Sequence, residues 1–141
     1  MKPKVIGYWV TTAIIEFELL VGGIADLVHG RVVLVAGPPV VDVLAHLGFP
    51  VYLLTILGIW KLLAGIVLVM PRFPRLKEWA YAGVFFHMTG AAASWIAIGD
   101  NTGEFITPLI FAVFAMASWA LRPPARILGT LSPVKLKAPE L

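Results

Sequence analysis

Four ionisable side chains interrupt the long apolar stretches of this sequence: Glu16, Glu18, Lys61 and His87. A carboxylate, an ammonium and an imidazole can together hold an anionic or carbonyl group and can take up or release a proton. A charge at the centre of a membrane-spanning helix costs roughly 2.5–3.5 kcal/mol to insert, so such groups are expected to pair or to be neutral. These residue types therefore predict a polar site inside apolar surroundings.

The spacing of these side chains predicts that they can meet. Counting about 1.5 Å per residue from the basic flank of each apolar segment places Glu16, Lys61 and His87 roughly 14–17 Å deep. Glu16 and Glu18 differ by about 200° around a regular helix, so different partners are expected for them. Glu18 shares a small and polar face with Gly22 and is expected to point inward, which leaves Glu16 for another helix or a neighbouring subunit.

Three roles fit this set of residues. An internal ion pair with a hydrogen-bonding histidine would fix how the helices pack. A ligand pocket is the second role, in which Lys61, His87 and Trp60 donate hydrogen bonds to a quinone or another small lipophilic carbonyl compound, with Glu16 and Glu18 beside them. A proton or ion path is the third. The leading prediction is the pocket in a redox or proton-transfer role, and the alternative is a non-enzymatic assembly subunit or a proton-coupled carrier.

Other kinds of chemistry lack support in the sequence. The chain has no cysteine, so disulfides and thiolate metal sites are excluded. Histidines and acids near the predicted external loops show no diagnostic metal-ligand spacing and are interpreted as a solvated acidic rim: Asp26, His29, Asp42, His46, Asp100 and Glu104. The net charge of +3 comes from lysines and arginines that flank apolar runs, which is typical of membrane anchoring and not of nucleic-acid binding.

The elements that must position these residues are predicted to be helices in a bilayer. The chain has 141 residues, of which 60% are apolar and 13% charged, and its mean hydropathy is +0.91. Four apolar segments, 5–28, 50–70, 78–99 and 104–121, each approach the roughly 20 residues that span a bilayer. The predicted fold is therefore an all-α bundle of four transmembrane helices over residues 1–131, followed by a cytoplasmic tail at 132–141.

The distribution of basic residues predicts the orientation of this bundle. If the four segments alternate, nearly all lysines and arginines fall on one side: positions 2, 4, 72, 75, 77, 122, 126, 135 and 137. The opposite side carries only Arg31, so both termini are predicted to be cytoplasmic. The connection 29–49 is the only long one, and within it Val40–Leu47 fits either a short interfacial helix or an irregular loop.

Several motifs resemble the DoxX-like family of small bacterial membrane proteins with four helices. They are Leu47–Leu53 (LGFPVYL), Leu57–Lys61 (LGIWK) and Pro71–Gly83 (PRFPRLKEWAYAG), with further similarity from Tyr8–Thr12 to Ser118–Pro123. The resemblance implies a bacterial inner-membrane location and makes Lys61, in its Gly-x-x-Lys setting, a recurrent polar site. Named relatives occur beside thiosulfate–quinone oxidoreductases and in membrane redox complexes, which implies a membrane redox partner or a homo-oligomer.

Overall fold

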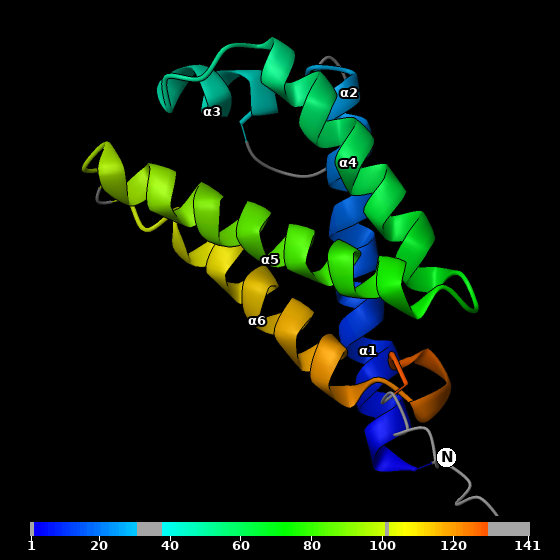
Figure 1. Cartoon of the computed structure of the whole chain (residues 1–141). Coiled ribbons are helices and arrows are strands. Elements are labelled where there is room, and N and C mark those ends of the chain that lie inside the picture. Colours follow the sequence, from blue (N-terminus) through cyan, green and yellow to red (C-terminus); the bar gives the residue numbers. More distant parts are fainter. Residues whose placement is uncertain (1, 31–37, 101, 130–141) are drawn as a thin grey trace, which may run out of the picture.

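Every regular element in the described part of the chain is a helix. The computed structural model describes residues 2–30, 38–100 and 102–129 (Figure 1). The helices are α1 (Pro3–Phe17), the π-helical η1 (Glu18–Gly22), α2 (Gly23–Leu27), α3 (Val40–His46), α4 (Tyr52–Val69), α5 (Pro74–Ala97), α6 (Ile106–Leu121) and the 3-10 helix η2 (Pro124–Arg126). The all-α prediction is confirmed for these residues, and the predicted tail at 132–141 lies outside them.

The first three elements form one continuous rod, called here the N-terminal helix. Its backbone stays right-handed helical through both joints, with φ/ψ of −63°/−45° at Glu18 and −63°/−41° at Gly23. The π-helical turn holds one more residue than an α-helical turn. In a regular helix Glu18 and Asp26 would lie about 80° apart, and the extra residue reduces this to about 20°. The π segment thus brings both carboxylates onto one face.

The N-terminal helix joins the other long helices. Its first part, α1, packs on α6, whereas η1 and α2 pack on α4, and α5 packs on both α4 and α6. Figure 1 shows α5 and α6 side by side, with the N-terminal helix crossing them before it runs along α4. The buried core contains side chains from α1, η1, α4, α5 and α6: Ile15, Leu19, Leu68, Tyr81, Val84, Met88, Ala112 and Ala115.

Two helix boundaries differ from the predicted segments 78–99 and 104–121. Helix α5 begins at Pro74, because proline suits the first helical turn, where its missing N–H is not needed. Phe73 before it adopts a left-handed backbone with φ 53°, which turns the chain sharply out of α4. The earlier start places Lys77 inside α5. Helix α6 begins at Ile106, so Glu104 lies in the preceding turn.

The connection after the N-terminal helix contains α3, so Val40–His46 is a helix and not an irregular loop. His46 Nε2 lies 2.7 Å from Asp100 Oδ2, at the loop that follows α5. The His46 ring also lies 5.5 Å from the Trp95 ring. The hydrogen bond from His46 lowers the pKa of the Asp100 carboxyl below its ordinary value of 3.8. α3 is therefore tied to the end of α5.

Chemically different residues gather at the two ends of the bundle. The N-terminus, the α4–α5 turn and the end of α6 lie together (Figure 1) and form the basic end, with Lys and Arg at positions 2, 4, 72, 75, 77, 122 and 126. The opposite end, called the acidic end, holds α3 and the α5–α6 turn. Its acids are Asp42, Asp100 and Glu104.

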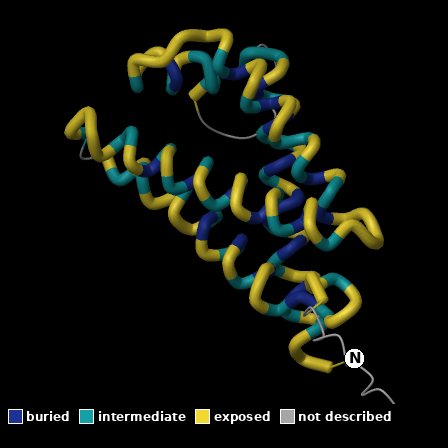
Figure 2. Tube along the Cα trace, in the orientation of Figure 1, coloured by how far each residue is buried: buried dark blue, intermediate teal, exposed yellow. Residues whose placement is uncertain are grey.

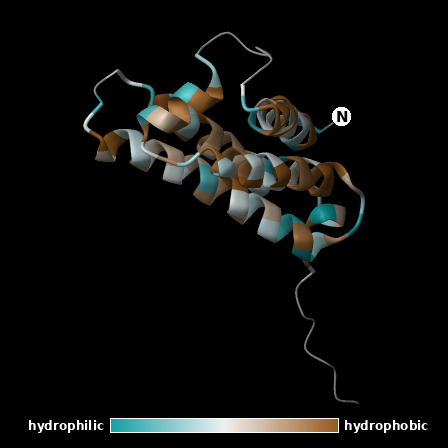
Figure 3. Ribbon diagram, turned by 90° about the horizontal axis from the view of Figure 1, so that it is seen from above, coloured by the Kyte–Doolittle hydropathy of each residue, from teal (hydrophilic) through white to brown (hydrophobic). Residues whose placement is uncertain are grey.

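The sides of the bundle are apolar. Large hydrophobic side chains are exposed along all four long helices, among them Val10, Phe17, Ile59, Phe86 and Val113. Figure 2 shows exposed positions along the outside of each helix, and Figure 3 shows hydrophobic residues along these helices with neutral and hydrophilic ones among them. Among the described residues one helix, α4, is long and apolar enough by itself to cross a membrane, and α6 is apolar but shorter.

Candidate functional site

A three-membered ion cluster lies between the N-terminal helix and α4. Lys61 Nζ is 3.1 Å from Glu18 Oε1 and 3.0 Å from Asp26 Oδ2. The Lys61 side chain is only 12% exposed and that of Asp26 only 5%. Two carboxylates and one ammonium sum to a charge of −1 when all are ionised, so the cluster has room for one more positive charge. Asp26 was expected in the external rim, and the π segment instead brings it to Lys61.

Glycines provide the space for these charged groups. A Cβ atom on Gly22 would lie 2.7 Å from Glu18 Oε1 and 3.1 Å from Lys61 Nζ. On α4, a Cβ atom on Gly65 would lie 3.0 Å from Glu16 Oε2. Larger residues at either position would therefore displace a carboxylate.

Both glutamates approach α4, which corrects the expectation that they have different partner helices. Glu16 reaches α4 from the flank of its own helix because Gly65 has no side chain in the way. Glu16 is also the more enclosed of the two: it is buried, whereas the Glu18 side chain is 24% exposed. Glu16 Oε1 has no hydrogen-bond partner among the described residues.

A cavity of about 410 Å³ lies between α4 and α5 and is called here the α4–α5 cavity. Lys61, His87 and Trp60 all line it, and most of its other lining residues are apolar. Trp60 and Trp79 at its mouth are 65% and 75% exposed, so the cavity opens to the apolar outside of the bundle. Within the described ranges, neither the His87 ring nor the Trp60 indole N–H has a hydrogen-bond partner.

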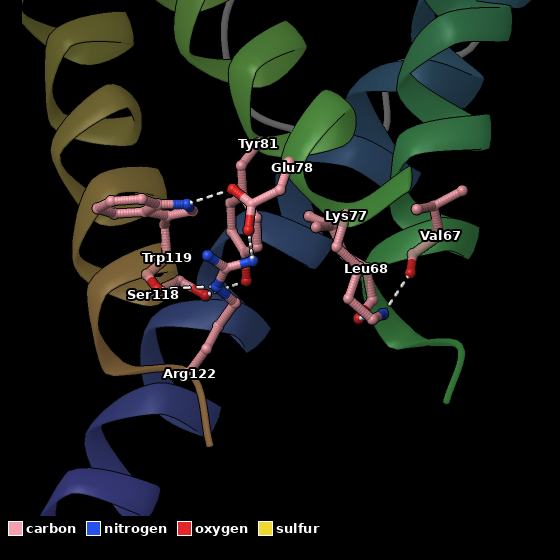
Figure 4. A network of polar contacts seen from close by, with 8 residues as sticks. All are labelled: Val67, Leu68, Lys77, Glu78, Tyr81, Ser118, Trp119 and Arg122. Atoms are coloured by element: carbon pink, nitrogen blue, oxygen red, sulfur yellow. Dashed lines mark hydrogen bonds and ion pairs between the residues drawn. The ribbon is translucent and has the colours of Figure 1, made fainter. Parts of the chain in front are cut away.

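A second polar network holds the basic end together (Figure 4). Lys77 Nζ donates to the backbone oxygens of Val67 and Leu68, which are orphan acceptors at the end of α4. Arg122 Nη1 lies 2.7 Å from Glu78 Oε1, and Trp119 Nε1 donates to Glu78 Oε2 at 2.8 Å. The Arg122 guanidinium also lies 5.2 Å from the centroid of the Tyr81 ring. This network joins α4, α5 and α6.

A line of buried hydroxyl groups connects α5, α6 and α1 near the same end. Tyr81 Oη lies 2.8 Å from Ser118 Oγ, and Ser118 Oγ lies 2.7 Å from Thr12 Oγ1. Thr12 Oγ1 donates to the backbone oxygen of Tyr8 at 2.6 Å. Tyr81, Ser118 and Thr12 are each at most 4% exposed. Three helices thus share one hydrogen-bonded series.

Comparison with known proteins agrees with this architecture. The family model described as the DoxX-like family matches residues 10–118, which include all four long helices in whole or in part. The chain belongs to the DoxX-like family. Searches of curated proteins and of solved structures found no significant match.

The structure of this DoxX-like chain groups the predicted site residues in two adjoining places. Glu18 and Lys61 belong to the ion cluster, whereas Trp60 and His87 line the α4–α5 cavity, and Lys61 is common to both. Glu16 lies apart, against Gly65 and in the field of Lys77. Sequence reasoning missed Asp26 as a partner of Lys61, and no local pattern distinguishes a π-helical turn from an α-helical one.

Sequence reasoning also missed the hydroxyl series of this DoxX-like chain. Thr12 and Ser118 come from the first and last long helices, and their only visible signal is a hydroxyl residue within an apolar run.

In the described part of the chain no group of three or more His, Asp or Glu side chains has the geometry of a metal site.

Proposed function

We propose that this DoxX-like chain is a multi-pass protein of the bacterial inner membrane, with four spans and both termini in the cytoplasm. The exposed apolar side chains along every long helix support this, because such a surface is stable against lipid and unfavourable in water. The basic end is then the cytoplasmic end, in agreement with the excess of Lys and Arg on cytoplasmic loops.

The lengths of the helices suit this placement. α4, α5 and α6 contain 18, 24 and 16 residues. At about 1.5 Å per residue they extend roughly 24–36 Å, which is comparable to a hydrocarbon core of about 30 Å. The π segment lies within the N-terminal helix and keeps its backbone hydrogen-bonded, as a bilayer demands.

The ligand we propose for the α4–α5 cavity is a small lipophilic carbonyl compound such as a quinone. The single observation behind this proposal is that His87 and Trp60, which have no hydrogen-bond partner among the described residues, both line with Lys61 a cavity that opens to the apolar exterior. A ligand dissolved in lipid enters such a cavity without crossing water. Its oxygens then accept hydrogen bonds from the imidazole and the indole.

A redox or proton-transfer role follows from this ligand class. Reduction of a quinone takes up protons, and the ion cluster at Lys61 adjoins the cavity. The electrons would come from a membrane redox partner, because the chain has no cysteine for redox chemistry of its own. A homo-oligomer is compatible with the exposed apolar sides.

The alternative is a non-enzymatic assembly subunit or a proton-coupled carrier. One observation favours it: Lys61 already has two carboxylate partners, so its pairing explains its presence without any ligand. In that case the cluster fixes the packing of the N-terminal helix on α4, or passes protons along it.

Ligand binding to variants separates these functions. A short-chain benzoquinone is titrated into the protein in lipid nanodiscs, and the heat of binding is measured. Lys61→Met, His87→Phe and Trp60→Phe are each expected to weaken binding by roughly 1–3 kcal/mol, the cost of an unpartnered polar group. Trp9→Phe, an exposed tryptophan outside the cavity, and Glu104→Gln should leave binding unchanged. If Trp60→Phe binds the quinone as tightly as Trp9→Phe, and a folded His87→Phe also binds it as tightly as the wild type, the ligand does not bind in the α4–α5 cavity.

A further inference from the structure

We propose that the chain contains a proton-entry path from the basic end to Glu16, formed by the hydroxyl groups of Tyr81, Ser118 and Thr12. Glu16 is the acceptor at the inner end of this path. Proton entry to Glu16 requires no ligand in the α4–α5 cavity, so the path and the ligand can be tested separately.

The hydrogen bonds in the path have one direction, which follows from counting protons. Thr12 gives its only hydroxyl proton to the Tyr8 backbone oxygen, so Ser118 must donate to Thr12. Ser118 then has no proton left for Tyr81, and Tyr81 must donate to Ser118. At the outer end, the Tyr8 hydroxyl accepts from Arg126 at 3.3 Å and lies beside the Tyr81 hydroxyl. The Tyr81 and Ser118 donors therefore point inward, whereas the Thr12 donor points back to the Tyr8 backbone oxygen.

The path begins where water is available. Arg126 is only half-buried and lies in η2 at the basic end, next to the end of α4. The hydroxyl groups behind it are buried, and side chains of α1, α5 and α6 enclose them. A series of hydroxyls, each able to donate and accept, carries a proton through such a region where isolated water would be costly.

Glu16 is placed to receive the proton. It follows Thr12 by four residues in α1, so the two side chains lie on the same face, one helical turn apart. The Glu16 residue is only 9% exposed, and its buried Oε1 has no partner among the residues that the structure describes. No hydrogen bond joins Thr12 to Glu16 among the described residues, so the transfer requires the Thr12 hydroxyl to turn away from the Tyr8 oxygen and the Glu16 side chain to move toward it.

The charged groups around Glu16 come from each helix packed nearby. Lys77 of α5 is the cation that acts most directly on it, and Lys61 of α4 lies one turn from Gly65, which Glu16 touches. Arg126 of η2 and, more weakly, Arg122 at the end of α6 act in turn on Lys77. Protonation of Glu16 leaves these cations with their own partners: Lys61 with the ion cluster, Lys77 with the α4 carbonyls and Arg122 with Glu78.

The transfer conserves bonds and charge. A hydronium ion at the basic end gives one proton to the Tyr81 oxygen and becomes water, the original Tyr81 proton moves to Ser118, and the Ser118 proton moves to Thr12. The Thr12 proton forms a new O–H bond on the Glu16 carboxylate, which becomes neutral. Each O–H bond that breaks is matched by one that forms, and rotation of the three hydroxyl groups restores the starting arrangement.

Infrared spectroscopy of the protein in nanodiscs tests the path. The C=O stretch of a protonated buried carboxylic acid is separate from the bands of ionised carboxylates and shifts when its proton exchanges for deuterium. The wild-type protein is expected to show such a band, which decreases from acidic to alkaline pH and shifts after transfer to heavy water. The band should be absent from Glu16→Gln and present in Glu104→Gln.

Isosteric variants test the route. Thr12→Val keeps the shape of the side chain but removes the hydroxyl, and we expect it to retain the band and slow its deuterium exchange roughly tenfold or more. Thr12→Ser restores a hydroxyl and should restore fast exchange. Thr89→Val is the matched control, because the Thr89 hydroxyl bonds only within α5. The proposal is overturned if the band does not change with pH or if it is still present in Glu16→Gln. It is also overturned if deuterium exchange of the band is equally fast in Thr12→Val and Thr89→Val.

Discussion

The ammonium of Lys61 lies 3.0 Å from the carboxylate of Asp26, across the contact between α4 and the N-terminal helix. Removing one member of a buried ion pair leaves the other without compensation, at a cost of about 3–5 kcal/mol. Lys61→Met is therefore expected to lower the melting temperature of the purified protein much more than Arg75→Met, whose side chain is exposed at the basic end. Equal shifts for the two variants would show that the cluster contributes nothing to stability.

The π segment leads to a prediction about deletions. Removing Leu20, an exposed residue of η1, should convert the wide turn into a regular α-helical turn and keep both flanks in register. Glu18 and Asp26 would then be seven residues apart and still share a face, at about 20°. We expect the Leu20 deletion to fold with a melting temperature close to that of the wild type.

Deletion of Ala13 is the matched control for this experiment. Ala13 is also exposed but lies in the regular part of α1, where loss of one residue rotates the preceding side chains by about 100°. This variant should lose most of its thermal stability. If the two deletions destabilise the protein equally, the wide turn does not set the register of Asp26.

Much of the fold can be predicted from the sequence, because long apolar runs that end in Pro, Gly or charged residues have few alternatives to helices in lipid. The shared depth of Lys61 and His87 also follows from counting residues, and both line one cavity. The position of Asp26 could not be predicted, because the i→i+5 turn at Glu18–Gly22 changes the direction in which every later side chain of the N-terminal helix points. The approach of Glu16 to Gly65 depends on the crossing of two helices, which only the packed structure defines.

The proposed four-span topology predicts where reporter fusions are active. Fusions after Met70 and after Gly129 should report a cytoplasmic location, whereas fusions after Pro39 and after Thr102 should report an external one. The measurement is the ratio of a reporter active only outside the membrane to one active only in the cytoplasm. The topology is refuted if a fusion after Met70 or Gly129 reports an external location, or if a fusion after Pro39 or Thr102 reports a cytoplasmic one.

The contact between His46 and Asp100 predicts a local effect of pH. Because the folded-state pKa of Asp100 is lowered, its contribution to stability is present above the ordinary value of 3.8 and is lost as the pH falls through the lower, folded value. Asp100→Asn should remove this contribution at neutral pH and increase hydrogen exchange in α3, measured by mass spectrometry, without changing α4. Asp42→Asn, an exposed acid in α3 itself, is the control and should exchange as the wild type does.

The contacts of Arg126 bear on the order in which the protein is made. Lys77 lies on α5, the next long helix along the chain, and donates to the last carbonyls of α4. The two helices can therefore enter the membrane as a hairpin in which these carbonyls are already hydrogen-bonded. Arg126 instead donates to Leu68 and Val69 from beyond the last long helix, and its guanidinium lies 4.9 Å from the centroid of the Trp9 ring. These contacts form only after the chain up to Arg126 has left the ribosome. A nascent chain interrupted before η2 would keep a loose basic end, open to the proteases that remove incomplete proteins.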